Sequence, residues 1–150
     1  MRLGFFLPQM GPAASAENMV TVAKRAEELG YETLWVTERL LFPVSPRSPY
    51  PSPDGSLPDV YKIVLDPVES LTYVAANTSK IGLGTSVLDS PYYNPVMLAR
   101  RLTTLDVLSS GRLRLGMGLG WSEDEYEASG AAMTQKGKRA DEFIGVLKAI

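Results

Sequence analysis

The segment that decides the fold runs from Leu113 to Trp121 and reads L-R-L-G-M-G-L-G-W. Its apolar residues alternate with arginine or glycine, which predicts a short buried strand that leads into a glycine-rich turn. Glycines at 116, 118 and 120 leave room for a flat or phosphorylated ligand to approach the main chain closely. They could equally let a strand cross a crowded sheet or barrel, and short glycine motifs recur by chance. The residue types leave both interpretations open.

Strand and helix signals alternate upstream of this segment. Short apolar runs predict three further strands, over about residues 2–7, 33–37 and 81–88, and the first of them is expected to be buried. Each intervening helix has a polar capping residue at its start. These caps are Ser15, Asp66 before Pro67, and Asn94 before Pro95. A fourth helix is expected from about residue 139, after an acidic loop that begins at Trp121.

The signals form four strand–helix units, and the first strand, helix and second strand are joined by short links, which implies parallel strands and a right-handed crossover. A closed (β/α)8 barrel takes eight such units and about 250 residues, so four units make half a barrel. The pattern alone also allows an open, doubly wound sheet. Both are α/β folds.

The longest stretch without a helix or strand signal lies at about residues 40–65. Six of the eleven prolines fall between Pro43 and Pro58. A loop of this length is uncommon in a compact domain unless it has a use. We expect it either to cover a ligand or to be disordered, and Tyr50 and Tyr61 within it favour a packed loop.

Composition narrows the chemistry that the 150 residues can perform. Fifteen basic and seventeen acidic residues give a net charge of −2 without a basic patch, so a nucleic-acid partner is not expected. The chain has no cysteine and no histidine, so we expect no metal site, and acid–base chemistry falls to carboxylates, tyrosine, lysine or a cofactor. No apolar run approaches the roughly 18 residues that span a bilayer, and no signal peptide is present, so a cytoplasmic protein without a membrane partner is expected.

In parallel α/β folds, ligands bind beyond the carboxyl ends of the strands. Four clusters are expected at that rim: Leu7–Gln9, Thr37–Arg39, Thr85–Leu88 and Gly118–Trp121. Glu38 could bond a ring N–H or act as a weak base, and Arg39 could hold an anion, although both could form a solvated turn pair. Thr85 and Ser86 could present hydroxyls to a flat ring, or they could finish a strand with local hydrogen bonds.

The glycine segment does not match a dinucleotide fingerprint. That motif requires G-x-G-x-x-G after the first strand, directly before a helix. Counting from Gly116, the sixth position is Trp121, and counting from Gly118 it is Glu123. The segment also follows the fourth strand, so spacing and context both argue against a Rossmann site.

Taken together, five segments resemble the bacterial-luciferase-like flavin-dependent oxidoreductases, and more narrowly the branch that uses the deazaflavin coenzyme F420. The resemblance runs across nearly the whole chain. The segments are R-L-G-F-F-L-P (2–8), A-E-E-L-G-Y-E-T-L-W-V-T-E (26–38), I-G-L-G-T-S-V-L (81–88), Y-N-P-V-M-L-A-R-R-L-T-T-L-D-V-L-S-S-G-R-L (93–113) and L-G-M-G-L-G-W-S-E-D-E-Y-E-A-S-G (115–130).

The resemblance implies a (β/α)8 TIM barrel, of which residues 1–150 supply the first four βα units with a proline-rich insertion at about 40–65. It implies a monooxygenase or hydride-transfer enzyme that binds FMN or coenzyme F420 and acts on a small organic substrate. A non-prolyl cis peptide behind the cofactor ring is expected at Ser86–Val87. The residues expected to contact the cofactor are Glu38, Thr85, Ser86, Val87, Gly118, Gly120 and Trp121.

Two departures limit this transfer. Many F420-dependent relatives carry Asp-His after the second strand, where this chain has Glu38-Arg39, so the histidine's role does not pass to Arg39 and no catalytic residue is assigned. Barrels of this kind hold cofactor phosphate with loops after strands seven and eight, which lie beyond residue 150.

The alternative function is a catalytically silent half-barrel that acts as an association module. An isolated half-barrel exposes strand edges, so we expect a homo-oligomer. Leu98, Leu102 and their neighbours, or the strand edges, are the expected interface.

Overall fold

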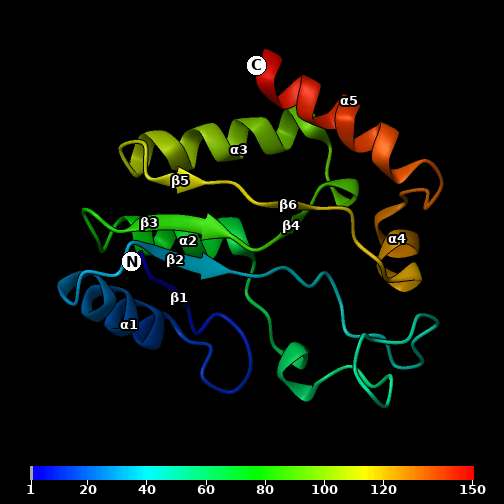
Figure 1. The fold of residues 1–150 in the computed structure, drawn as a ribbon, viewed down its shortest axis with the longest axis horizontal. Coiled ribbons are helices and arrows are strands. Elements are labelled where there is room, and N and C mark those ends of the chain that lie inside the picture. Colours follow the sequence, from blue (N-terminus) through cyan, green and yellow to red (C-terminus); the bar gives the residue numbers. More distant parts are fainter. Residues whose placement is uncertain (1) are drawn as a thin grey trace.

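The computed structural model describes residues 2–150 and contains a four-stranded parallel sheet with helices packed against it (Figure 1). The sheet strands are β1 (Gly4–Phe6), β2 (Thr33–Val36), β3 (Gly82–Thr85) and β5 (Leu113–Arg114). Their register places Phe5, Leu34, Leu83 and Leu113 in one row across the sheet. A second, two-stranded parallel sheet joins β4 (Leu88–Asp89) to β6 (Met117–Gly118). These two short strands continue β3 and β5 beyond the main sheet (Figure 1).

The strand order distinguishes the two α/β folds that the sequence allows. The main sheet has the order β1-β2-β3-β5, so each strand lies beside the next one along the chain. A doubly wound sheet reverses direction after its first strands, whereas a barrel advances around its axis without reversal. The chain therefore forms the first four strands of a (β/α)8 arrangement, as the resemblance implies.

The helices follow the predicted starts, with one exception. They are α1 (Ala16–Glu28), α2 (Pro67–Ala75), α3 (Pro95–Leu108), α4 (Glu123–Ser129) and α5 (Lys136–Ala149), with 3-10 turns η1 (Asp59–Lys62) and η2 (Ser90–Tyr92). Ser15, Asp66 and Asn94 each accept hydrogen bonds from the first turn of their helices, which confirms the three predicted caps. Across residues 2–150, no helix has the length and apolar character needed to cross a membrane.

The expectation of an acidic loop after Trp121 is wrong, because this segment forms helix α4. Ser122 accepts a hydrogen bond from the Glu125 amide, and Gly130 ends the helix with a positive φ of 70°. The spacing Ser122-x-x-Glu125 is that of a capping box, so the sequence did contain a helix-start signal. The acidic residues of the first turn also suit the positive end of the helix dipole.

The first strand is exposed rather than buried, which corrects a second expectation. Phe5 and Phe6 are 45% and 51% exposed. Within residues 2–150, β1 pairs on one side only, with β2, and so forms an edge of the sheet. The fourth strand is likewise less buried than expected, and Leu115 is 38% exposed between the short strands β5 and β6.

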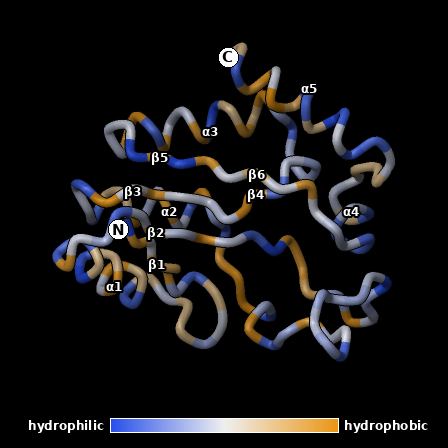
Figure 2. The backbone as a smooth tube through the Cα atoms, viewed as in Figure 1, coloured by the Kyte–Doolittle hydropathy of each residue, from blue (hydrophilic) through white to orange (hydrophobic). Residues whose placement is uncertain are grey.

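The hydrophobic core lies between the sheet and helices α1, α2 and α3. Leu34, Leu83 and Leu71 are fully buried there. Leu98 and Leu102 on α3 are also buried in this core, so the expectation that these two residues supply an oligomer interface is wrong, while the oligomer itself stays a prediction. Figure 2 shows hydrophilic and hydrophobic residues alternating along α3.

Candidate functional site

A cavity of about 340 Å³ opens at the carboxyl ends of the strands. This volume lies within the range of about 300–1,000 Å³ that is usual for ligand pockets. Six of the seven predicted contact residues line it: Glu38, Ser86, Val87, Gly118, Gly120 and Trp121. The other lining residues are Thr37, Arg39, Tyr50, Tyr61, Asp89 and Leu119. That any of them contacts a cofactor stays a prediction.

The segment between β3 and β4 forms one wall of the cavity. The Ser86–Val87 peptide bond is cis, which confirms the expectation. The Ser86 amide donates to the Val36 carbonyl at 2.7 Å, while both Ser86 and Val87 remain exposed. Thr85 is the predicted contact that the structure does not bring to the cavity. Its buried hydroxyl donates to the Gly116 carbonyl at 2.7 Å and accepts from the Gly116 amide at 3.0 Å.

The glycines of the 113–121 segment are required by close packing between protein segments. A Cβ on Gly116 would lie 2.3 Å from the Thr85 carbonyl oxygen. A Cβ on Gly118 would lie 2.4 Å from an Asp89 carboxyl oxygen, and one on Gly120 would lie 2.4 Å from the Tyr92 hydroxyl. Protein atoms therefore occupy the space that these glycines leave. Gly118 and Gly120 nevertheless line the cavity, so main chain forms that part of its wall.

Glu38 follows β2 and holds a carboxyl group at the edge of the cavity. One carboxyl oxygen accepts from the Tyr93 hydroxyl, and the other accepts from the Asp89 amide at 2.5 Å. Burial raises the pKa of Glu38 from 4.5 to about 7, against the lowering effect of these two hydrogen bonds. Nearby Asp89 and Asp66 raise it further. A carboxyl group that titrates near neutrality can both hold and release a proton.

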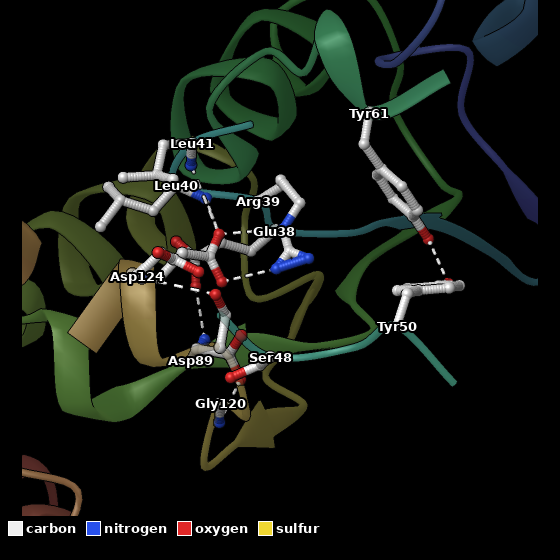
Figure 3. Close-up of polar contacts among 12 residues, drawn as sticks. Glu38, Arg39, Leu40, Leu41, Ser48, Tyr50, Tyr61, Asp89, Gly120 and Asp124 are labelled. Atoms are coloured by element: carbon white, nitrogen blue, oxygen red, sulfur yellow. Dashed lines mark hydrogen bonds and ion pairs between the residues drawn. The ribbon is translucent and has the colours of Figure 1, made fainter. Parts of the chain in front are cut away.

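Arg39 forms a buried ion pair with Glu125 of α4. Its Nε and Nη2 atoms donate to the two carboxylate oxygens at 2.9 and 2.7 Å. The same carboxylate accepts from the main-chain amides of Leu40 and Leu41 and from the Tyr92 hydroxyl. Figure 3 shows Arg39, Leu40 and Leu41 with the dashed lines of their hydrogen bonds, and the Tyr50–Tyr61 pair in the same view. Glu38 and Arg39 therefore do not form a solvated turn pair, and the charge of Arg39 is already balanced by Glu125.

Aromatic side chains form another part of the cavity wall, and two of them come from the proline-rich loop. The hydroxyls of Tyr50 and Tyr61 lie 3.1 Å apart, and the Tyr50 ring meets the Trp121 ring edge-on at 5.7 Å. This contact confirms that the loop is packed rather than disordered. The loop and α4 lie on the same side, beyond the ends of the strands (Figure 1). Arg47 joins them through ion pairs with Asp124 and Glu127.

The first rim cluster, Leu7–Gln9, does not reach the cavity. Gln9 is fully buried, and its side-chain amide donates to the carbonyls of Thr37 and Leu65 at 3.1 and 2.8 Å. These bonds join the two ends of the proline-rich loop. Gln9 therefore acts on the site indirectly, by holding the two ends of the loop together.

Sequence reasoning did not find three residues that shape the site: Asp89, Tyr93 and Glu125. Glu125 could have been found from the capping-box spacing, which places it in the first turn of α4. Tyr93 and Asp89 have no such signal, because they meet Glu38 only through the fold.

Comparison with known proteins agrees with this architecture. Residues 1–150 match the model of the luciferase-like monooxygenase family. The chain belongs to this family. It is 36% identical over 130 residues to an uncharacterized protein of Mycobacterium tuberculosis (strain ATCC 25618 / H37Rv), a match that covers 85% of this chain and 46% of the relative.

A further curated relative and a solved structure are informative. The chain is 34% identical over 128 residues to the F420-dependent glucose-6-phosphate dehydrogenase of Amycolatopsis mediterranei, covering 81% of this chain and 34% of the enzyme. The oxygenating constituent of Pseudomonas putida 3,6-diketocamphane monooxygenase, solved in complex with FMN, superposes with a TM-score of 0.74. That match covers 98% of this chain and 38% of the neighbour, at 17% identity, and so shows the fold. The chain spans less than half the length of the curated relatives it matches.

Proposed function

We propose that residues 1–150 form the N-terminal half of a flavin- or deazaflavin-dependent oxidoreductase that acts on a small organic substrate. The observation that carries this proposal is the cavity at the carboxyl ends of the strands, where six of the seven predicted contact residues meet. Family membership supports it, since the family includes oxidoreductases named for F420 and solved with FMN. Coenzyme F420 and FMN are both candidates.

The lining residues suit the ring of such a cofactor better than its phosphate. Trp121, Tyr50 and Tyr61 offer flat surfaces, and Ser86 and Arg39 offer hydrogen-bond donors for ring carbonyls. The only basic residue among the lining residues is Arg39, whose charge is paired with Glu125. A phosphate would therefore find no unpaired cation among the residues that line this cavity.

When bound, the cofactor would accept or deliver the hydride or activate oxygen, as flavin-type cofactors do. The protein would bind the ring, shield it from water with the proline-rich loop, and hold a proton on Glu38. Because the reactive atom belongs to the cofactor, the absence of histidine and cysteine does not oppose this function.

Cofactor titration of the full-length protein tests the proposal. We expect saturable quenching of FMN or F420 fluorescence together with a change in the visible spectrum. A protein that perturbs neither cofactor at saturating concentration would overturn the proposal.

The exposed edge strand favours a second candidate, an association module without catalysis. Phe5 and Phe6 in β1, and Leu3 just before it, are each about half exposed, and such an edge is a template for pairing. We expect the 150-residue chain alone to form a dimer or larger assembly in light scattering. A folded monomer would contradict this candidate and leave the cofactor proposal untouched.

A further inference from the structure

The guanidinium of Arg39 is bonded to Glu125 through only part of its donor set, and Arg39 lines the cavity. Two of the three guanidinium nitrogen atoms, Nε and Nη2, donate to Glu125. Within residues 2–150, Nη1 makes no hydrogen bond, yet it is not among the buried atoms that lack a partner. Since Arg39 lines the cavity, Nη1 is an accessible donor with two N–H groups.

This donor is fixed in place. The side chains of Arg39 and Glu125 are only 6% and 2% exposed. The guanidinium carbon also lies 4.9 Å from the centre of the Trp121 ring and 5.7 Å from that of Tyr61. Two parallel bonds to a carboxylate and two aromatic contacts restrict rotation of the guanidinium. A donor held this way loses little freedom when it bonds a ligand.

The charges around Nη1 decide which acceptor it suits. Glu125 balances the positive charge of Arg39, and the carboxyl groups of Glu38 and Asp89 also line the cavity. A fully ionised phosphate or carboxylate would meet these acidic groups without an unpaired cation to offset them. A neutral carbonyl oxygen needs only the donor. The surrounding aromatic rings further favour a carbonyl carried by a planar molecule.

We propose that Arg39 donates through Nη1 to a carbonyl oxygen of the planar molecule bound in this cavity, and that Glu125 is the positioning residue that aims it. The inference rests on the proposed function and deepens it. The carbonyl belongs either to the cofactor ring or to the substrate.

Arg39→Lys in the full-length protein tests the inference. A lysine can still pair with Glu125. It lacks the planar guanidinium, however, whose nitrogen atoms can bond that carboxylate and a ligand at the same time. If the carbonyl belongs to the cofactor, the Kd for FMN or F420 rises at least about tenfold and the visible absorption band shifts. If it belongs to the substrate, cofactor binding and spectrum stay unchanged, while KM rises by about the same factor with a smaller change in kcat.

Glu125→Gln tests the positioning role of Glu125 separately from the hydrogen bond that Arg39 donates to the ligand. The amide oxygen can still accept from Leu40 and Leu41, but the charged bidentate pair is lost. We expect Glu125→Gln to raise the same constant, Kd or KM, that Arg39→Lys raises. The double variant Arg39→Gln/Glu125→Gln leaves no unpaired buried charge, so it keeps the test valid where a single variant unfolds. It is expected to lose as much affinity as Arg39→Lys, because the two residues act as one unit.

Arg47→Lys is the matched control. Arg47 also pairs with carboxylates of α4, but it is half exposed and does not line the cavity. We expect it to leave the Kd and KM unchanged. If the native protein binds the cofactor, and neither Arg39→Lys nor the double variant changes the Kd, the spectrum or the KM, this inference is overturned. The proposed function would then still stand. A native protein that binds neither cofactor would overturn the proposed function as well.

Discussion

The hydroxyl of Tyr93 donates a hydrogen bond to the carboxylate of Glu38, 55 positions earlier in the chain. The bond joins the end of β2 to the turn before α3 and fixes Glu38 at the edge of the cavity. It stabilises the ionised carboxylate, while burial favours the neutral acid. The balance puts the pKa of Glu38 at about 7, so this group changes charge near neutral pH.

Glu38→Gln is expected to change how stability depends on pH. The folded protein raises the pKa of Glu38 from 4.5 to about 7, so the folded state binds its proton more tightly than the unfolded chain does. This group therefore lowers the free energy of unfolding as pH rises from about 4.5 to about 7, by about 3 kcal/mol in all. An amide does not titrate, so the variant lacks this decline. Urea unfolding at pH 5 and pH 8 measures the difference, and an equal decline in both proteins would contradict it.

Tyr93→Phe is expected to raise the pKa of Glu38 above its native value. The variant removes a hydrogen bond to the ionised form and leaves the burial that favours the neutral form. Infrared titration of the protonated carboxyl band measures the shift, and Glu38→Gln identifies that band by its loss. Tyr73→Phe, on the exposed side of α2, is the control that should leave the titration in place. An unchanged or lowered pKa in Tyr93→Phe would show that the bond does not control Glu38.

The parts of this fold that the sequence predicts are those that local chemistry determines. Asp66 before Pro67 and Asn94 before Pro95 are caps whose partners lie two or three residues away, and the structure forms both. The predicted site clusters meet because the carboxyl ends of parallel strands share one rim, whichever α/β fold forms. Glu38, Ser86 and Trp121 therefore reach one cavity.

The parts that the sequence did not predict depend on partners that are distant in the chain. Arg39 and Glu125 are 86 positions apart, so no local pattern shows that they pair. The exposure of Phe5 depends on which strand lies beside β1, and within residues 2–150 only β2 does. The sequence places Thr85 at the carboxyl end of a strand. Its hydroxyl nevertheless bonds the main chain of Gly116, which lies 31 positions later.

Arg112→Met is expected to lower the free energy of unfolding by about 3 kcal/mol, because its guanidinium bonds several main-chain carbonyls that water cannot easily reach. Arg112 donates to the carbonyls of Ala75, Thr78 and Ile81 and so joins the end of α2 to β3. Arg114→Met is the matched control, because Arg114 is 46% exposed and pairs with Glu32 at the surface. Such a surface pair contributes about 1 kcal/mol or less. Urea unfolding of both variants checks the difference, and equal losses would contradict it.

Gly118→Ala and Gly145→Ala are expected to act in opposite directions. A methyl group on Gly118 would lie 2.5 Å from the Val87 side chain and 2.4 Å from an Asp89 carboxyl oxygen, so these side chains or the main chain at Gly118 must shift. We expect a loss of about 1–3 kcal/mol in the free energy of unfolding, together with weaker cofactor binding. A methyl group on Gly145 would meet nothing within 4 Å, and alanine favours helix α5 over glycine by about 1 kcal/mol.

The pair separates packing from a general intolerance of larger residues. Thermal unfolding and FMN or F420 titration of both variants provide the measurements. Gly118→Ala with native stability would show that the close approach of Val87 and Asp89 does not require a glycine at this position. Weaker binding in Gly118→Ala but not in Gly145→Ala would locate the effect at the cavity wall, because only Gly118 lines the cavity.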